Sequence, residues 1–306
     1  MTTGLYWHSA ATGHLTPEGH PEQVARAHSV EAALAGLELD RREAPLADEA
    51  DLLRCHPQSY LDRIQAEVPA GSAVALDGDT YLSAGSFESA SRAVGGAVAA
   101  VDAVLAGQLG NAFVAMRPPG HHATHDTAMG FCLLSTVAIA AMRALDHHGL
   151  ERVAVLDFDV HHGNGTQDLL WNESRVLFAS SHQMPLFPGS GAASEQGAHG
   201  QIVNKPLSPG TGGHEARQAW DQIIARARSF DPQLVIISAG FDAHSADPLG
   251  QLNWSEADFV AITRAICDMA AQCGAPVVSS LEGGYDLAAL GRSVRAHVET
   301  LIEAQA

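Results

Sequence analysis

The chain has 306 residues, enough to bury a large core as one extended α/β domain or as two ordinary ones. Lys and Arg number 17 against 35 Asp and Glu, and the formal net charge of -18 argues against nucleic acid as the main partner, because phosphate binding needs a basic surface. Lys205 is the only lysine, which argues against a lysine nucleophile or Schiff base. Histidine, with 17 residues, is as common as both permanent cations together.

From hydropathy and cysteine spacing we expect a globular protein, with the cytoplasm as its default location. No apolar run approaches the roughly 20 residues of a membrane-spanning helix, so we expect no membrane partner. The first ten residues, MTTGLYWHSA, lack the cationic and apolar regions of a secretory signal. Because the four cysteines form no CxxC pair, we expect reduced, mostly buried thiols rather than disulfides or a thiolate zinc site.

Strands and helices alternate in the predicted structure. In chain order we expect a helix over 22–39, a helix over 87–105, a strand over 112–116, a helix over 133–148, strands over 152–158 and 175–180, a helix over 214–228, a strand over 234–238, a helix over 255–272, a strand over 276–280 and a helix over 287–303. This alternation predicts a mostly parallel central sheet flanked by helices. No stretch has the composition of a linker, so one domain over residues 1–306 is the simpler interpretation.

Polar side chains follow the strand in VAVLDFDVHHGNG (153–165). Asp157, Asp159 and His161 share parity along the chain, so they are expected to project to one side at the end of the strand. No lysine or arginine lies nearby in the sequence to offset the two carboxylates. The segment therefore predicts a bound cation.

A second strand ends near Asp242, in LVIISAGFDAHSADP (234–248). Ligands bind at the carboxyl ends of the strands in open parallel sheets, so Asp242 is expected to meet Asp159 and His161 there. Two carboxylates and an imidazole with one open position match a catalytic zinc site. Fe²⁺ or Co²⁺ would fit the same ligands.

Two further segments supply candidate catalytic groups after strands. In RPPGHHA (117–123), one of His121 and His122 can take a proton from water while the other protonates a leaving amine. Asp157 and Asn164 are candidates to fix their tautomers. In LEGGYDL (281–287), two glycines precede Tyr285, whose hydroxyl can donate to a developing oxyanion.

Taken together, the segments resemble the histone deacetylase superfamily, specifically its class II branch and the bacterial amidohydrolases similar to it. The motifs RPPGHHA, GFC (130–132), LDFDVHHGNG (156–165), AGFDAHSADPLG (239–250) and LEGGYDL follow the family's order and spacing. The resemblance extends from GHPE (19–22) to the final helix. It implies the single-domain, three-layer arginase/deacetylase-like α/β fold and zinc-dependent hydrolysis of linear amide C–N bonds in acylated amines.

The resemblance also implies roles for individual residues. The family's metal ligands fall on Asp159, His161 and Asp242, its tandem catalytic histidines on His121 and His122, and its transition-state tyrosine on Tyr285. A structural potassium ion is expected beside Asp157, the backbone carbonyls of Asp159 and His161, and residues near Ser180 and Ser181. The implied substrate tunnel includes the aromatic walls Phe131 and Phe187, with Gly130, Leu249 and the candidate rim acid Asp79.

Two positions distinguish branches of the family. Asn164 stands where class I members carry Asp, which fits class II and predicts that His122 is held less strongly as a cation. Leu249 occupies the position where polyamine-selective relatives place a glutamate. The sequence therefore lacks one residue expected for a preference for acetylpolyamines.

Alternatives in function and assembly stay open at this point. A dinuclear manganese ureohydrolase shares the implied fold, although its second metal needs carboxylates where this chain has Gly163 and His244. A non-catalytic protein that binds an acylated ligand is a second alternative. Acetyl-lysine in proteins, acetylpolyamines, longer acyl-lysines and small acylated metabolites all fit as substrates. Either a homodimer or a tetramer is compatible with the family.

Overall fold

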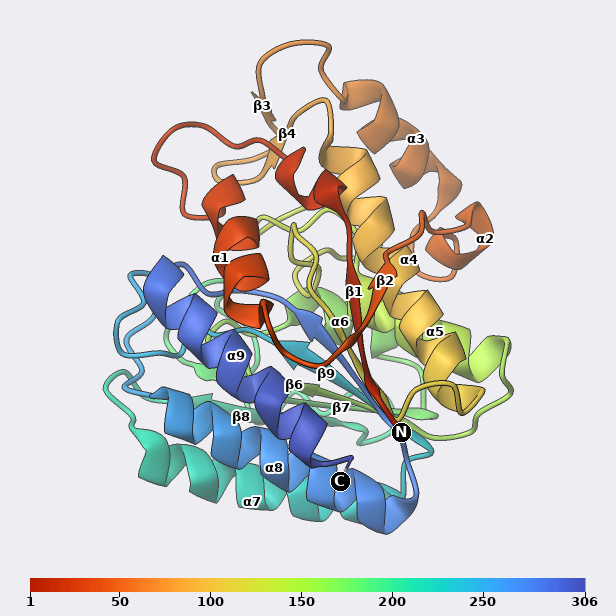
Figure 1. Ribbon diagram of the computed structural model, residues 1–306, viewed down its shortest axis with the longest axis vertical. Helices are drawn as coiled ribbons and strands as arrows, with labels where there is room; N and C mark the ends of the chain where they lie inside the picture. The colour runs from red at the N-terminus through yellow and green to blue at the C-terminus, as the bar shows by residue number, and fades with distance from the viewer. Residues whose placement is uncertain (306) are drawn as a thin grey trace.

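The computed structural model describes residues 1–305 and contains an eight-stranded sheet (Figure 1). Every neighbouring pair of strands in it is parallel, as expected from the alternation of strands and helices. The spatial order is β2-β1-β5-β10-β9-β6-β7-β8. The strands are β1 (Thr3–Trp7), β2 (Asp40–Glu43), β5 (Asn111–Val114), β6 (Val153–Asp157), β7 (Val176–Gln183), β8 (Ile202–Leu207), β9 (Leu234–Ala239) and β10 (Val277–Leu281).

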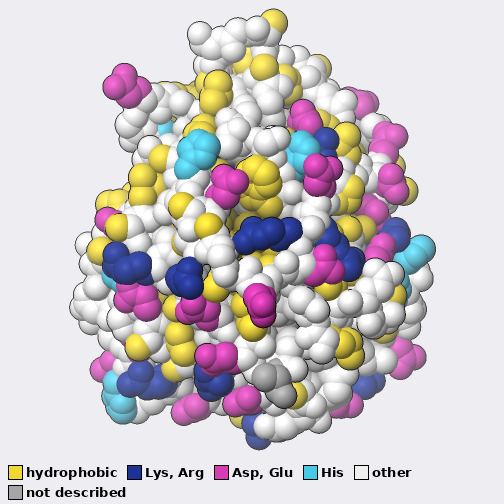
Figure 2. Space-filling view, viewed as in Figure 1, with side chains coloured by type: hydrophobic (Ala, Val, Ile, Leu, Met, Phe, Trp, Pro, Cys, Tyr) yellow, Lys and Arg dark blue, Asp and Glu magenta, His cyan; other side chains and the backbone are white. Residues whose placement is uncertain are grey.

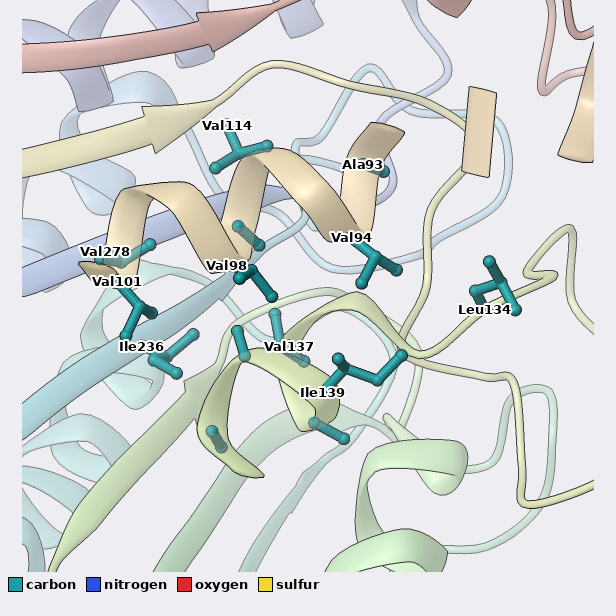
Figure 3. Close-up of a cluster of buried hydrophobic side chains, with 14 of the residues drawn as sticks. Ala93, Val94, Val98, Val101, Val114, Leu134, Val137, Ile139, Ile236 and Val278 are labelled. Carbon is teal, nitrogen blue, oxygen red and sulfur yellow. The ribbon is translucent and has the colours of Figure 1, made fainter. Parts of the chain in front are cut away.

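Helices cover both faces of this sheet, which confirms the three-layer architecture. On one face lie α4 (Ser86–Leu105) and α5 (Thr136–Asp146), and on the other α1 (Val24–Leu34), α7 (Gly213–Phe230), α8 (Glu256–Cys273) and α9 (Leu287–Glu303). Figure 3 shows aliphatic side chains of α4 and α5 meeting those of the central strands. The shorter elements are η1 (Ser9–Thr12), α2 (Glu49–Leu52), α3 (Gln58–Glu67), α6 (Asn164–Leu170) and a hairpin of β3 (Val74–Ala75) and β4 (Tyr81–Leu82).

The predicted strands and helices are all present, with corrected ends. The helix expected over 22–39 stops at Leu34, shortly before Gly36 takes a left-handed φ of 79°. The helix expected over 133–148 is α5, which begins only at Thr136. Of the two histidines after α5, His147 is exposed, whereas His148 is partly buried with Nε2 2.6 Å from an Asp102 carboxylate oxygen.

Strands at the two sheet edges escaped prediction because they lack apolar runs. β2 has the sequence DRRE, and β8 contains Lys205 and Pro206. Charges and proline are typical of edge strands, where they discourage pairing with another chain. All four cysteines are free, and three of them are buried, as expected for mostly buried thiols. Within the described residues, no helix has the length and apolar character needed to cross a bilayer.

The strand order decides where functional groups meet. The last two strands of the chain, β9 and β10, insert between β5 and β6. The four central neighbours are therefore β5, β10, β9 and β6, and all four are parallel. Their carboxyl ends lie along one edge of the sheet, where a ligand crevice is expected in folds of this kind.

Candidate metal centre and active site

Asp159, His161 and Asp242 form a compact buried cluster at the carboxyl ends of β6 and β9. One potential ligand atom from each residue lies within 4.8 Å of the others. Nδ1 of His161 is 3.1 Å from Oδ1 of Asp159 and 3.2 Å from Oδ2 of Asp242. The structure therefore brings together the three residues predicted as metal ligands.

Backbone N–H groups orient the two carboxylates of the cluster. Val160 donates to Oδ1 of Asp242 at 2.9 Å, and His161 donates to Oδ1 of Asp159 at 2.8 Å. Gly283 donates to the other Asp159 oxygen at 2.9 Å. A Cβ atom at Gly283 would collide with Asp242 and lie 2.6 Å from Oδ2 of Asp159, so only glycine keeps this space open. An open cradle with two carboxylates and one imidazole fits a divalent metal with a free coordination position.

The charges of the cluster favour a cation. Burial lowers the pKa of His161, but hydrogen bonds to Asp159 and Asp242 outweigh it and raise that pKa to about 10. A proton on Nδ1 of His161 then lies between two carboxylates. A divalent metal bound by the same atoms competes with this proton, as expected for a site whose ligands bind metal in their deprotonated forms.

The tandem histidines stand beside the cluster with different partners. Nδ1 of His121 is 3.0 Å from Oδ2 of Asp157, and Nδ1 of His122 is 2.7 Å from Oδ1 of Asn164. These contacts match the predicted orienting pairs. Because the Asn164 oxygen only accepts, Nδ1 of His122 donates to it, which leaves Nε2 of a neutral His122 as a proton acceptor.

Burial and charge separate the protonation states of the two rings, whose centroids are 4.0 Å apart. Burial lowers the pKa of His121, but Asp159 and Asp157 outweigh it and raise that pKa to about 10. Burial, with positive charge on His121 and His161, lowers the pKa of His122 well below its ordinary value. At neutral pH this arrangement provides a cationic His121 beside a neutral His122.

Tyr285 lies at the same edge of the sheet, four residues beyond the end of β10. Its ring meets that of Phe131 edge to face at 5.6 Å. Burial raises its pKa well above the ordinary value of 10, so the phenol keeps its proton. A protonated hydroxyl is a hydrogen-bond donor suited to a developing oxyanion.

A cavity of about 220 Å³ connects these groups with the surface. His122, His161 and Tyr285 line its inner part. The predicted tunnel residues also line it, together with Leu186, which the sequence interpretation missed: Asp79, Gly130, Phe131, Phe187 and Leu249. Asp79 reaches the aromatic wall through Thr80, whose hydroxyl donates to Asp79 and accepts from the N–H of Phe131.

The residues predicted for potassium are neighbours in the sheet. Asp157 pairs with Ser180 in the β6–β7 register. Ser180 Oγ is 2.9 Å from Nδ1 of His182, and Ser181 Oγ accepts from the indole N–H of Trp220 at 3.0 Å. Potassium at this position stays a prediction.

Buried charged residues that the sequence interpretation did not assign support the site from behind. Glu282 accepts hydrogen bonds from the backbone N–H groups of Gly120 and His121. Arg26 donates to the carbonyls of Glu282 and Gly284, and its guanidinium lies 4.9 Å from the centroid of the Tyr285 ring. Glu282 directly follows the buried strand β10, VVSSL, but this position alone indicated no partner for it.

Comparison with known proteins identifies the family to which this fold and site belong. A profile of the histone deacetylase domain matches residues 20–301. The chain belongs to the histone deacetylase family. It is 42% identical over 283 residues to a histone deacetylase-like amidohydrolase of Pseudomonas aeruginosa, covering 90% of this chain and 73% of that protein.

Other members of the histone deacetylase family agree over nearly the whole chain. A probable deacetylase of Archaeoglobus fulgidus is 38% identical over 298 residues, covering 94% of this chain and 82% of that protein. The crystal structure of the HDA15 HD domain superposes with a TM-score of 0.93 at 32% identity, over 99% of this chain and 88% of that one. Membership in this family supports hydrolysis of an amide.

Proposed function

We propose that this histone deacetylase family member is a zinc-dependent amidohydrolase that removes acetyl or other acyl groups from primary amines. The observation that carries the proposal is the convergence, on one cavity, of a three-residue ligand cluster, a neutral histidine and a protonated tyrosine. Hydrolysis of an amide needs all three functions: electrophilic activation, a base and an oxyanion donor.

Asp159, His161 and Asp242 would hold the metal, with zinc as the first choice and Fe²⁺ or Co²⁺ as compatible substitutes. When bound, the metal supplies Lewis acidity and lowers the pKa of water toward roughly 7. The residues around the cradle then have distinct tasks: they accept a proton, return it and stabilise negative charge.

His122 is the better placed of the two histidines to act as general base. Its Nδ1–H is engaged by Asn164, and its ring lines the cavity, so Nε2 can accept a proton from the attacking water. As the C–N bond breaks, the same nitrogen can deliver that proton to the departing amine. His121, held as a cation by Asp157, would help to stabilise the negative charge that develops on the acyl group.

Tyr285 would donate its hydroxyl proton as a hydrogen bond to the oxygen that develops charge when water adds to the acyl carbon. The products are a carboxylate and a free amine. Phe131 and Phe187 would enclose the linear chain of the substrate, and Asp79 would lie at the outer end of the cavity. Leu249 there offers no charge to a second ammonium group, so we favour acyl-lysine or small acylated amines over acetylpolyamines.

The site favours one catalytic metal over two. In the described residues, Asp159, His161 and Asp242 are the group of three or more potential ligands that converges on one point. Gly163 supplies no ligand, and Nε2 of His244 faces Glu256 at 3.4 Å. A non-catalytic role finds no support, because every catalytic residue predicted from the resemblance is present at the cavity or next to it.

A turnover panel with purified, zinc-loaded protein tests the proposal. The substrates are an acetyl-lysine peptide, an acetylpolyamine, a lysine peptide with a longer acyl group and a small acylated metabolite, and the measured quantity is released carboxylate. We expect turnover on at least one class and about one metal per chain. Asp242→Asn is the matched variant, expected to lose both metal and turnover. Absence of turnover on all four classes by protein with measured metal content would contradict the proposal.

A further inference from the structure

Asp247 is a buried carboxylate that the proposed reaction leaves without a task. It lies five residues after Asp242, with 7% of its surface exposed. Its side chain accepts three backbone hydrogen bonds from two segments far apart in the sequence. Leu249 donates to Oδ1 at 3.0 Å, and Tyr285 and Asp286 donate to Oδ2 at 2.6 and 3.2 Å.

Asp247 binds the backbone N–H groups at the end of the segment that carries Tyr285, whereas Asp159 and Arg26 bind the backbone of residues 282–284. Residues 282–285 form neither helix nor strand, and α9 begins only at Leu287. Gly284, directly before the tyrosine, has a φ of 120°, which side chains other than glycine rarely adopt. The two N–H groups that donate to Oδ2 of Asp247 belong to Tyr285, which carries the phenol, and to Asp286, the N-cap of α9.

The third hydrogen bond of Asp247 ties this segment to the cavity wall. Leu249 and Tyr285 both line the cavity, on segments that come from β9 and β10. One carboxylate therefore fixes a wall residue and the oxyanion donor relative to each other. A catalytic group displaced by about 1 Å can lose on the order of 100-fold in rate, so such fixing matters for turnover.

We propose that Asp247 is a positioning residue that fixes Tyr285 against the acyl group and links it to the cavity wall at Leu249. This inference rests on the proposed deacylation and adds to it a residue that touches neither substrate nor metal. Asp247 acts by placing the Tyr285 backbone, and no proton passes through it.

Two substitutions separate the functions of the carboxylate. Asp247→Ala removes all three acceptors, and we expect kcat to fall about 100-fold with metal content unchanged. Asp247→Asn keeps one oxygen that can accept from Tyr285 and Asp286, while its amide group cannot accept from Leu249. We therefore expect Asp247→Asn to recover most of kcat and to show its defect mainly in KM. The matched control is Asp258→Ala, which removes another buried carboxylate near the start of α8 and is expected to lower Tm without this loss of kcat.

A double-mutant cycle with Tyr285→Phe tests whether Asp247 acts through the tyrosine. We expect Asp247→Ala combined with Tyr285→Phe to be no slower than Tyr285→Phe alone. Losses that multiply, or wild-type kcat in Asp247→Ala, would overturn the proposal. If Asp247→Ala does not fold, Asp247→Ser replaces it in the same cycle. The serine side chain is shorter than that of aspartate, so its hydroxyl reaches fewer of the three donors.

Hydrogen exchange provides a readout that does not depend on activity. The amides of Tyr285 and Asp286 should exchange faster in Asp247→Ala than in the wild-type protein and near the wild-type rate in Asp247→Asn. Unchanged exchange in Asp247→Ala would show that these amides do not rely on Asp247 and would overturn the proposal. An inactive wild-type protein would overturn the proposed function together with the positioning role of Asp247. An active wild-type protein whose kcat is matched by Asp247→Ala would overturn the role of Asp247 alone.

Discussion

Protonation at the candidate site is set by which partners each buried group meets. His121 and His122 are adjacent in sequence and equally buried, yet His121 faces the carboxylate of Asp157 and His122 faces the neutral amide of Asn164. Burial therefore prevails at His122, whereas carboxylates prevail at His121. Two identical side chains obtain the complementary states that acid–base catalysis needs.

Substitution of Tyr285 by Phe removes one hydroxyl and leaves the metal ligands in place. We expect kcat to fall about 100- to 1,000-fold, the usual cost of losing one oxyanion donor. Metal content and Tm should stay close to those of the wild-type protein. Wild-type turnover in Tyr285→Phe would contradict the assigned role of the phenol.

Substitution of Asn164 by Asp tests how His122 is kept neutral. A carboxylate 2.7 Å from Nδ1 in place of the amide oxygen favours the imidazolium and raises the pKa of His122. Since the proposed base must be unprotonated, we expect the acidic limb of the kcat/KM profile to move to higher pH by about one pH unit or more. Asn164→Ser, which adds no charge, is the control; an acidic limb that does not move in Asn164→Asp would show that His122 is not the base.

The sequence was informative about residues whose chemistry follows a strand and less so about residues that act through distant contacts. Asp159, His161 and Asp242 could be proposed as a cluster because parallel strands end at a common edge. Asp247 and Glu282 could not be assigned, since a single acid carries no spacing signal and their partners lie 38 and 161–162 residues away. Leu186 was missed because one leucine in a loop gives no indication that it faces a cavity.

Among the secondary-structure elements, the central strands and long helices followed from their apolar patterns, whereas the edge strands did not. β2 and β8 at the edges, and β1 beside β2, became strands through pairing with their neighbours. Sequence order also concealed spatial order, because β9 and β10 insert between β5 and β6. That insertion brings Tyr285 close to the tandem histidines, and local periodicity contains no information about it.

Helix α4 packs closely against the segment 44–47 at Gly95. This contact predicts that Gly95→Ala destabilises the protein, whereas helix propensity alone predicts stabilisation. Alanine is favoured over glycine by about 1 kcal/mol within a helix. A Cβ at Gly95, however, would collide with the carbonyl oxygen of Pro45 and lie 2.7 Å from the backbone nitrogen of Ala47. Because backbone cannot yield as a side chain can, we expect Gly95→Ala to lower the free energy of unfolding by about 1–3 kcal/mol in denaturant titration.

Gly96→Ala is the matched control for Gly95→Ala. A Cβ there would lie 3.0 Å from the Cβ of Ala44 and 3.2 Å from a methyl group of Val114, so these neighbours need to move by only a few tenths of an ångström. We expect a smaller loss of stability than for Gly95→Ala. A Gly95→Ala variant as stable as the wild-type protein would show that the segment 44–47 moves away at little cost.

For the whole molecule, the excess of acidic residues divides between the interior and the surface. Asp157, Asp159 and Asp242 are buried at the site, where His121 and His161 face them. On the face shown in Figure 2, arginines lie among acidic side chains, and pairs such as Arg292 with Glu256 link α9 to α8. The acidic balance can attract cationic substrates by long-range steering that weakens with salt.

Buried neutral histidines make the stability of the whole protein sensitive to acid. His297 is fully buried between Thr263 and Ser279, and burial lowers its pKa from 6.5 to about 3. Between these two values the unfolded chain binds a proton that the folded protein does not, so this contribution is complete above pH 6.5 and is lost as pH falls toward 3. At pH 5 the loss from this residue is about 2 kcal/mol. Denaturant titrations at pH 8 and pH 5 measure this loss in the free energy of unfolding. We expect the difference between the two pH values to be smaller by about this amount in His297→Gln and unchanged in the control His147→Gln, which replaces an exposed histidine. An undiminished difference in His297→Gln would show that other groups cause the acid sensitivity.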